Sequence, residues 1–169
     1  SEAATDGFSA LAFSFGSGMT NIALGYNAIE GMSFSVARGG DWIDSGAARA
    51  VGGTSARMCS IKESGLDLQN PKTREEEAIV FYYKELVQYA LDWVATEFTA
   101  RGLGQMVTKP IPIIVSGGTS TATGFIDLFR EVLAKKGKKM PLEITEVRAA
   151  AEPFDAVARG LLIQAMQED

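Results

Sequence analysis

The sequence contains no histidine and a single cysteine, Cys59. A chain without histidine cannot form a Ser-His-Asp triad, use a histidine as general base or bind a metal through imidazole. One cysteine excludes an internal disulfide and a thiolate cluster, which fits a reducing compartment. No apolar run approaches the roughly 20 residues of a membrane span. These absences favour a cytoplasmic location.

Basic residues are also few. Lys and Arg number 16 against 21 Asp and Glu, and the net charge is −5 without any basic block. Nucleic acid is therefore not expected as a partner. The 169 residues are 46% hydrophobic and 22% charged, a soluble globular composition. This length suffices for one domain with its own core, so we expect a single domain over residues 1–169.

The first two thirds of the chain predict strands followed by helices. Short apolar or alternating segments at 10–15, 20–26 and 32–37 are typical of three strands, and their short connections favour an antiparallel meander. Asp41 is a good N-cap for a helix to about residue 51, and a short helix follows at 55–64. Thr73 and Glu76 then form a capping box that starts a long helix, which ends near Arg101 and Gly102.

The last third alternates between strand and helix. Strands are expected at 112–116 and 142–147, and helices at 124–136 and 153–167. This order favours parallel pairing with right-handed crossovers. The whole pattern predicts an α/β fold with a five-stranded mixed sheet, three antiparallel strands and then two parallel ones, with helices on both faces.

Three glycine-containing turns are candidates for ligand binding: 16–18 between the first two strands, 39–41 before the first helix, and 117–119 after a buried strand. Bare backbone can approach a ligand there, and its N–H groups can bind an anion. Taken singly, each also fits an ordinary turn or helix cap. None is a Walker loop, and Asn21 stands where a full GxGxxG would have its third glycine.

The order of these turns resembles the actin-like ATPase superfamily of actins, bacterial actin homologues and heat-shock chaperone ATPases. Residues 13–22 look like its second phosphate hairpin, 39–44 like its Gly-Gly-Asp helix start, 114–124 like its adenosine motif and 156–160 like its second connecting helix. The likeness covers nearly the whole chain but only the second half of the family's two-domain body. It implies a ribonuclease-H-like domain with a small outer helical subdomain at about 53–104.

The resemblance further implies the nucleotide-binding half of an actin-like ATPase, such as a bacterial or archaeal cytoskeletal actin homologue. ATP or ADP with Mg²⁺ would bind in the full-length parent. The implied partners are the missing first ATPase domain, or a partner chain that supplies it, and further copies through self-association. The residues implied to contact the nucleotide are Gly16, Ser17, Gly18, Thr20, Gly39, Lys62, Glu63, Gly117, Gly118 and Thr119.

Ser14 departs from the family's pattern. The resembling hairpin opens with an aspartate that holds Mg²⁺-bound water, whereas a serine brings no charge to oppose the cation. Slow hydrolysis is expected, with no residue assigned as catalytic or as a metal ligand. Asp41 and Asp44 are candidates to replace that acid, although both positions are also typical of helix caps. One alternative is a chaperone-like or reactivating ATPase of the same fold. The other is a nucleotide-blind interaction module that kept the fold, and Ser14 is its best support.

Overall fold

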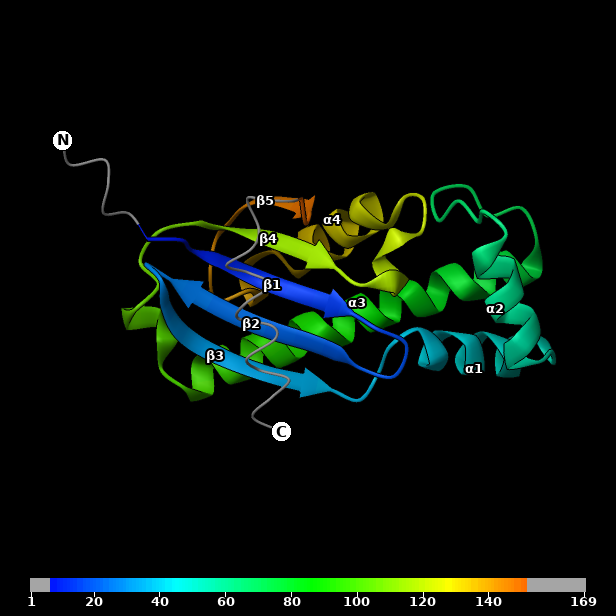
Figure 1. The fold of residues 1–169 in the computed structure, drawn as a ribbon, viewed down its shortest axis with the longest axis horizontal. Helices are drawn as coiled ribbons and strands as arrows, with labels where there is room; N and C mark the ends of the chain where they lie inside the picture. Colours follow the sequence, from blue (N-terminus) through cyan, green and yellow to red (C-terminus); the bar gives the residue numbers. More distant parts are fainter. Residues whose placement is uncertain (1–6, 152–169) are drawn as a thin grey trace.

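A computed structural model describes residues 7–151 of the chain (Figure 1). Five strands, four α-helices and three short 3₁₀ helices follow one another in this part. In chain order they are β1 (Ala10–Phe15), β2 (Thr20–Tyr26), β3 (Ile29–Val36), α1 (Gly40–Val51), α2 (Ser55–Glu63), α3 (Arg74–Ala100), η1 (Leu103–Gln105), β4 (Ile111–Ser116), η2 (Gly118–Thr121), α4 (Phe125–Lys136), η3 (Gly137–Lys139) and β5 (Ile144–Ala149).

The strands form one mixed sheet in the order β3-β2-β1-β4-β5. The first three strands pair antiparallel, β4 is parallel to β1, and β5 is parallel to β4. The predicted sheet is thereby confirmed. β3 begins three residues before the predicted alternation, because Asn27 and Ala28 make a tight turn with φ of 51° and 62°.

Large apolar side chains cover one face of the sheet. Leu11, Phe13 and Phe15 alternate along β1 and point into the main core. The rings of Phe13 and Phe15 each lie 5.3 Å from an α4 ring, those of Phe129 and Phe125 respectively, in edge-to-face contacts. α3 and α4 lie behind the sheet in Figure 1, so the helical layer and the sheet enclose this core.

The other face of the sheet carries small residues. Ala10, Ala12 and Ala23 form a second buried cluster there with Ile114. Within residues 7–151, the α-helices contribute their buried side chains to the first face. The helix predicted at 153–167, and with it the segment that resembles the second connecting helix, lies outside the described residues. No helix of the described part is long and apolar enough to span a membrane.

The observed N-caps of the helices agree only in part with those predicted from the sequence. Thr73 caps α3 as predicted, accepting from Glu76 N at 3.1 Å, and Glu76 in turn accepts from Lys72 N at 2.6 Å. The prediction that Asp41 caps α1 is wrong. The N-cap is Gly39 and Asp41 lies in the first turn, because its N–H donates to the carbonyl of Ser17 at 2.8 Å. A distant turn satisfies a donor that a cap would otherwise satisfy.

Candidate functional site

The three glycine-containing turns meet at the end of the sheet where β1 and β4 finish. Gly40 N donates to Gly16 O at 2.9 Å, beside the bond from Asp41 N to Ser17 O. Thr119 Oγ1 donates to the same Gly16 carbonyl at 2.9 Å. Gly16 thus joins the β1–β2 turn to the start of α1 and to η2. Three turns that are separate in the sequence become one site.

Two of the glycines are required by this close packing. A Cβ on Gly39 would lie 2.3 Å from Gly16 O, and a Cβ on Gly117 would lie 2.3 Å from Phe15 O. Gly117 also has a φ of 95° and a ψ of 153°, a conformation that is essentially restricted to glycine. Gly118, in contrast, would direct a Cβ into open space. The bare backbone of Gly118 therefore faces the cavity rather than the protein.

The cavity beside these turns, which we call the hairpin pocket, has a volume of about 540 Å³. This volume lies in the range of ordinary small-molecule sites. The β1–β2 turn, α1, α2, the start of α3 and the η2 segment surround it. The residues that line it are Ser17, Gly40, Asp41, Asp44, Cys59, Lys62, Glu63, Gly65, Leu66, Tyr83, Gly118, Thr119, Thr121, Ala122 and Thr123.

Half of the sequence-predicted nucleotide residues lie in this lining: Ser17, Lys62, Glu63, Gly118 and Thr119. The structure places the other half next to the pocket, where they shape its wall.

These remaining residues make contacts within the protein or lie at the turn. The hydroxyl of Thr20 is buried and donates to Arg38 O at 2.8 Å. Gly16 accepts the two bonds described above, while Gly39 and Gly117 pack against neighbouring backbone. Gly18 lies exposed in the turn, where an added Cβ would meet nothing.

A buried ion pair crosses the pocket wall from α2 to α1. Lys62 Nζ lies 2.8 Å from Asp44 Oδ1 and also donates to Gly40 O at 3.2 Å. The two side chains are only 13% and 7% exposed. Burial raises the pKa of Asp44, and the neighbouring Lys62 partly offsets that shift. Lys62 therefore contacts α1 at Gly40, the residue whose N–H donates to Gly16 in the β1–β2 turn.

A family model described as Volactin matches residues 1–165. The chain belongs to the volactin family. No curated protein sequence matches it.

Solved structures add the fold. The volactin-family chain is similar to the ethanolamine utilization protein EutJ from Carboxydothermus hydrogenoformans, with 19% identity, a TM-score of 0.60 and coverage of 94% of this chain and 49% of that one. It is also similar to a non-polymerising MamK mutant bound to AMPPNP, with 16% identity, a TM-score of 0.63 and coverage of 93% and 54%. These likenesses confirm the actin-like, ribonuclease-H-like fold. The chain spans about half the length of the structures that it matches.

Sequence reasoning missed two side chains of the volactin-family pocket. Asp44 was interpreted as a helix cap, and its spacing of one turn from the Gly39–Asp41 segment was the available signal. Tyr83 lies on the buried face of the long helix, and its hydroxyl donates to Thr119 O at 3.3 Å. Burial raises the pKa of Tyr83 to about 12, so that this hydroxyl stays protonated at neutral pH.

Cys59 lines the pocket as an unreactive thiol. Its Sγ lies 3.7 Å from Glu63 Oε1. Burial raises the pKa of the thiol, and the carboxylates of Asp44 and Glu63 add to this shift. A thiol rather than a thiolate is therefore present at neutral pH.

The end of β1 is neutral in this volactin-family chain. Ser14 pairs with Asn21 on β2 and with Ser116 on β4, and Ser35 Oγ donates to Asn21 Oδ1 at 2.5 Å. The structure finds no cluster of three or more acidic, Cys or His side chains fit for a metal among the residues that it describes. Polar neutral groups thus occupy the row in which the resemblance expects an acid.

Proposed function

We propose that this chain is the nucleotide-binding half of an actin-like ATPase and that the hairpin pocket holds the adenosine of ATP or ADP. The observation that carries the proposal is the convergence of three bare-backbone turns on one cavity that also presents Lys62, Glu63 and Tyr83. The pocket volume and its few polar groups suit a nucleoside. A MamK mutant of similar fold is bound to AMPPNP, which supports the same ligand class.

The exposed β1–β2 turn is the proposed phosphate side. The N–H of Gly16 donates a hydrogen bond to Met19 O. The N–H groups of Ser17 and Gly18, in contrast, have no backbone partner among residues 7–151. Successive free N–H groups in a tight turn form a concave site for an anion. Gly18 lacks a side chain that would keep a phosphate at a distance.

The residues fit a nucleotide better than they fit a protein-bound Mg²⁺. When bound with ATP, Mg²⁺ would neutralise part of the phosphate charge. The acidic residues that line the pocket are Asp41, Asp44 and Glu63, of which Asp44 is paired with Lys62. Ser14 offers a hydroxyl and no charge. We therefore propose slow hydrolysis in the full-length parent.

The chain needs a second half in this proposal. It spans about half of the similar actin-like structures, so a first ATPase domain, in the same polypeptide or in a partner, would close the cleft. The proposed outer subdomain at about 53–104 would form one wall of this cleft. A MamK double helical filament also shares the fold, at a TM-score of 0.64, which supports self-association in the cytoplasm as the wider role.

Titration of the isotopically labelled chain with ADP tests the proposal by nuclear magnetic resonance. Half of the phosphate contacts are absent, and each charge-assisted hydrogen bond contributes roughly 1.5–3 kcal/mol, so we expect a dissociation constant of about 1 mM or weaker. Shifts should concentrate at Lys62, Gly118 and Thr119. Gly118→Val should remove them, because its Cβ meets no protein atom within 4 Å and its methyl groups would extend into the cavity.

Gly104→Val is the matched control, since its Cβ also meets nothing and the residue lies in η1, away from the pocket. A low-micromolar constant for this chain alone would contradict the half-site assignment. No shift at about 10 mM ADP, in this chain or in the full-length parent, would favour the nucleotide-blind interaction module. Unchanged affinity in a folded Gly118→Val parent would remove Gly118 from the adenosine site.

A further inference from the structure

A second cavity lies at the opposite end of the sheet, where β4 and β5 begin. We call it the lysine groove. Its volume is about 820 Å³, and its wall runs from the segment before β4 across the C-terminal end of α4 to the segment before β5. In Figure 1 this end lies to the left, whereas α1 and α2 lie to the right. The proposed nucleotide site and the lysine groove are thus separated by the length of the sheet.

The inside of the lysine groove is apolar. Val107, Leu133, Met140 and Ile144 line it, and each of these side chains is half-buried. They pack against the main core and form its partly exposed outer layer at this end. Apolar surface that is open to water in a cavity of this size is typical of a site that binds another molecule.

The rim of the groove carries two lysines, Lys109 and Lys138, against one carboxylate, Glu143, so its net charge is positive. Lys109 and Lys138 line it and are exposed, and neither forms an ion pair with any residue of the described part. The neighbouring lysines of α4 differ, because Lys135 pairs with Glu131 and Lys136 with Asp92. Two unpaired cations beside an apolar groove are notable in a chain of net charge −5. They attract carboxylates locally and repel basic partners.

The walls of the groove are held in place by the protein itself. Ile111 N donates to Glu143 O at 3.1 Å, which joins the two segments that enter the sheet. The hydroxyl groups of Tyr26 and Thr108 lie 3.2 Å apart and share a hydrogen bond, which fixes the residue before Lys109. A preformed groove saves the entropy that ordering on binding would otherwise cost.

We propose that the lysine groove binds a short segment of a partner protein in which apolar side chains are flanked by Asp or Glu. The apolar residues would occupy the groove, and the carboxylates would pair with Lys109 and Lys138. Both lysines are long and exposed, so they can follow carboxylates at slightly different positions. Because the groove lies away from the hairpin pocket, binding there leaves the nucleotide site open.

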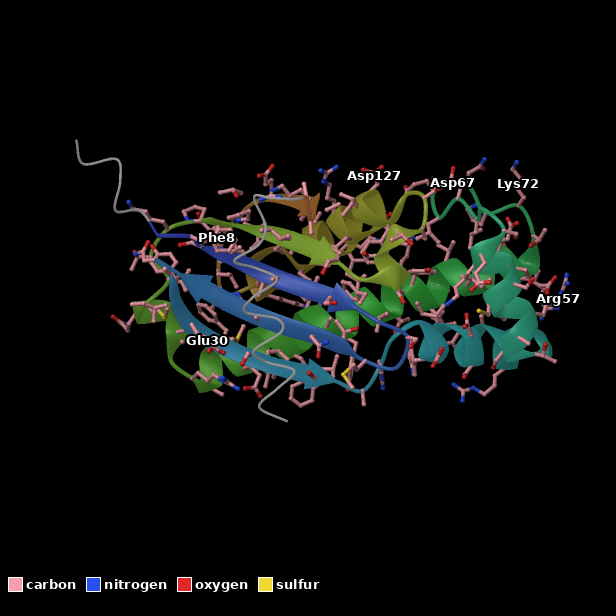
Figure 2. All side chains as sticks on the ribbon, in the orientation of Figure 1. Phe8, Glu30, Arg57, Asp67, Lys72 and Asp127 are labelled. Atoms are coloured by element: carbon pink, nitrogen blue, oxygen red, sulfur yellow. The ribbon has the colours of Figure 1, made fainter. Side chains whose placement is uncertain are left out.

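Selection from a random twelve-residue peptide library on the immobilised full chain tests this proposal. We expect the enriched peptides to combine apolar residues with two or more acidic ones. One such peptide, synthesised with a fluorescent label, should bind about fivefold or more weakly to Lys138→Glu and to Lys109→Glu, and also more weakly at high salt. Lys72→Glu is the matched control with the same change of net charge, because Lys72 lies at the far end of the molecule (Figure 2).

Three results would overturn the proposal. The first is a set of selected peptides that is basic or has no shared pattern. The second is a selected acidic peptide whose affinity is unchanged in both groove variants. The third is sedimentation showing that the chain associates with itself and that Lys138→Glu abolishes this, which would assign the groove to a second copy. Because the lysines are exposed, circular dichroism should show all three variants folded like the wild type.

Discussion

The two ends of the sheet hold their cavities open by different means. At the hairpin pocket the turns behind the wall are tied together by bonds such as those of Gly40 N and Thr119 Oγ1 to Gly16 O, and the buried pair of Lys62 and Asp44 joins two of its helices. At the lysine groove the wall is made of half-buried apolar side chains, and its charges are unpaired. Both ends are tied by hydrogen bonds within the protein, but Lys62 at the first end is ion-paired and buried, whereas Lys109 and Lys138 at the second are exposed and form no ion pair among residues 7–151.

This difference predicts which substitutions each end tolerates. Where backbone packs against backbone, as at Gly39 and Gly117, there is no spare volume, so an added methyl group must displace main chain. A wall built from exposed side chains can lose or reverse a charge with little effect on folding. The hairpin pocket should therefore be sensitive in stability, and the lysine groove sensitive only in binding. Four substitutions test this contrast.

Gly117→Ala should have the largest effect. Its Cβ would lie 2.3 Å from the Phe15 carbonyl, and its backbone conformation is strained for any other residue. Together these terms predict a loss of about 3–5 kcal/mol in the free energy of unfolding, measured by urea denaturation. Gly118→Ala, one residue on and facing open space, should change it by less than about 0.5 kcal/mol. Equal effects at both glycines would contradict the packed wall.

Lys62→Met should lower the free energy of unfolding by about 3 kcal/mol, because it leaves the Asp44 carboxylate buried without a cation. The loss should be smaller in Lys62→Met with Asp44→Asn, which removes both charges.

The pH dependence of that loss has a definite sign. Burial raises the pKa of Asp44, so ionisation of this carboxyl opposes folding as the pH rises through that pKa. Protonated Asp44 needs no cation. The deficit of Lys62→Met relative to wild type should therefore shrink as the pH falls below the pKa of Asp44. A deficit that stays constant from neutral to acidic pH would show that Lys62 acts by packing alone.

Ala28→Gly should stabilise the end of the sheet near the lysine groove. Ala28 has a φ of 62°, which is unfavourable for a residue with a Cβ, and the turn lies beside Glu30 at the left in Figure 2. Relief of this strain, less the added freedom of the unfolded chain, predicts a gain of about 0.5–1 kcal/mol in thermal or urea unfolding. Ala50→Gly, on the exposed side of α1, should instead lose about 0.5–1 kcal/mol.

Lys138→Glu should have the smallest effect on stability, within about 0.5 kcal/mol of wild type, because Lys138 is exposed and unpaired among residues 7–151. Denaturation of this variant beside Lys62→Met compares an unpaired lysine with a buried one in the same chain. A loss near 3 kcal/mol at Lys138 would show that the groove lysines hold the fold and would end the contrast between the two ends.

Features that depend on neighbours in the chain could be predicted from the sequence. The alternation in β1 and β2, the short turn between them and the Thr73 cap are all local, and the structure has them. The fold could be predicted from the order of the three glycine-containing turns, because that order resembles the actin-like ATPase superfamily. Five lining residues of the hairpin pocket were named in the same way.

Features that depend on contacts across the fold could not be predicted. Asp41 has the residue type of a cap, yet a carbonyl from the β1–β2 turn satisfies its N–H, and no local pattern shows this. Asp44 gains its role only when α2 packs against α1 and brings Lys62 to it. The lysine groove joins segments before β4, after α4 and before β5, so no local pattern brings Lys109 and Lys138 together.

α3 extends along the sheet between these two ends (Figure 1). It has 27 residues, or about 40 Å of rigid rod. Tyr83 near its start touches the hairpin pocket, and beyond its end Val107 N donates to Leu103 O at 3.0 Å, which joins η1 to the edge of the lysine groove. From Tyr83 onward the helix measures about 25 Å, and its buried residues continue as far as Phe98. One continuous, core-packed element therefore spans the distance between the walls of the two cavities.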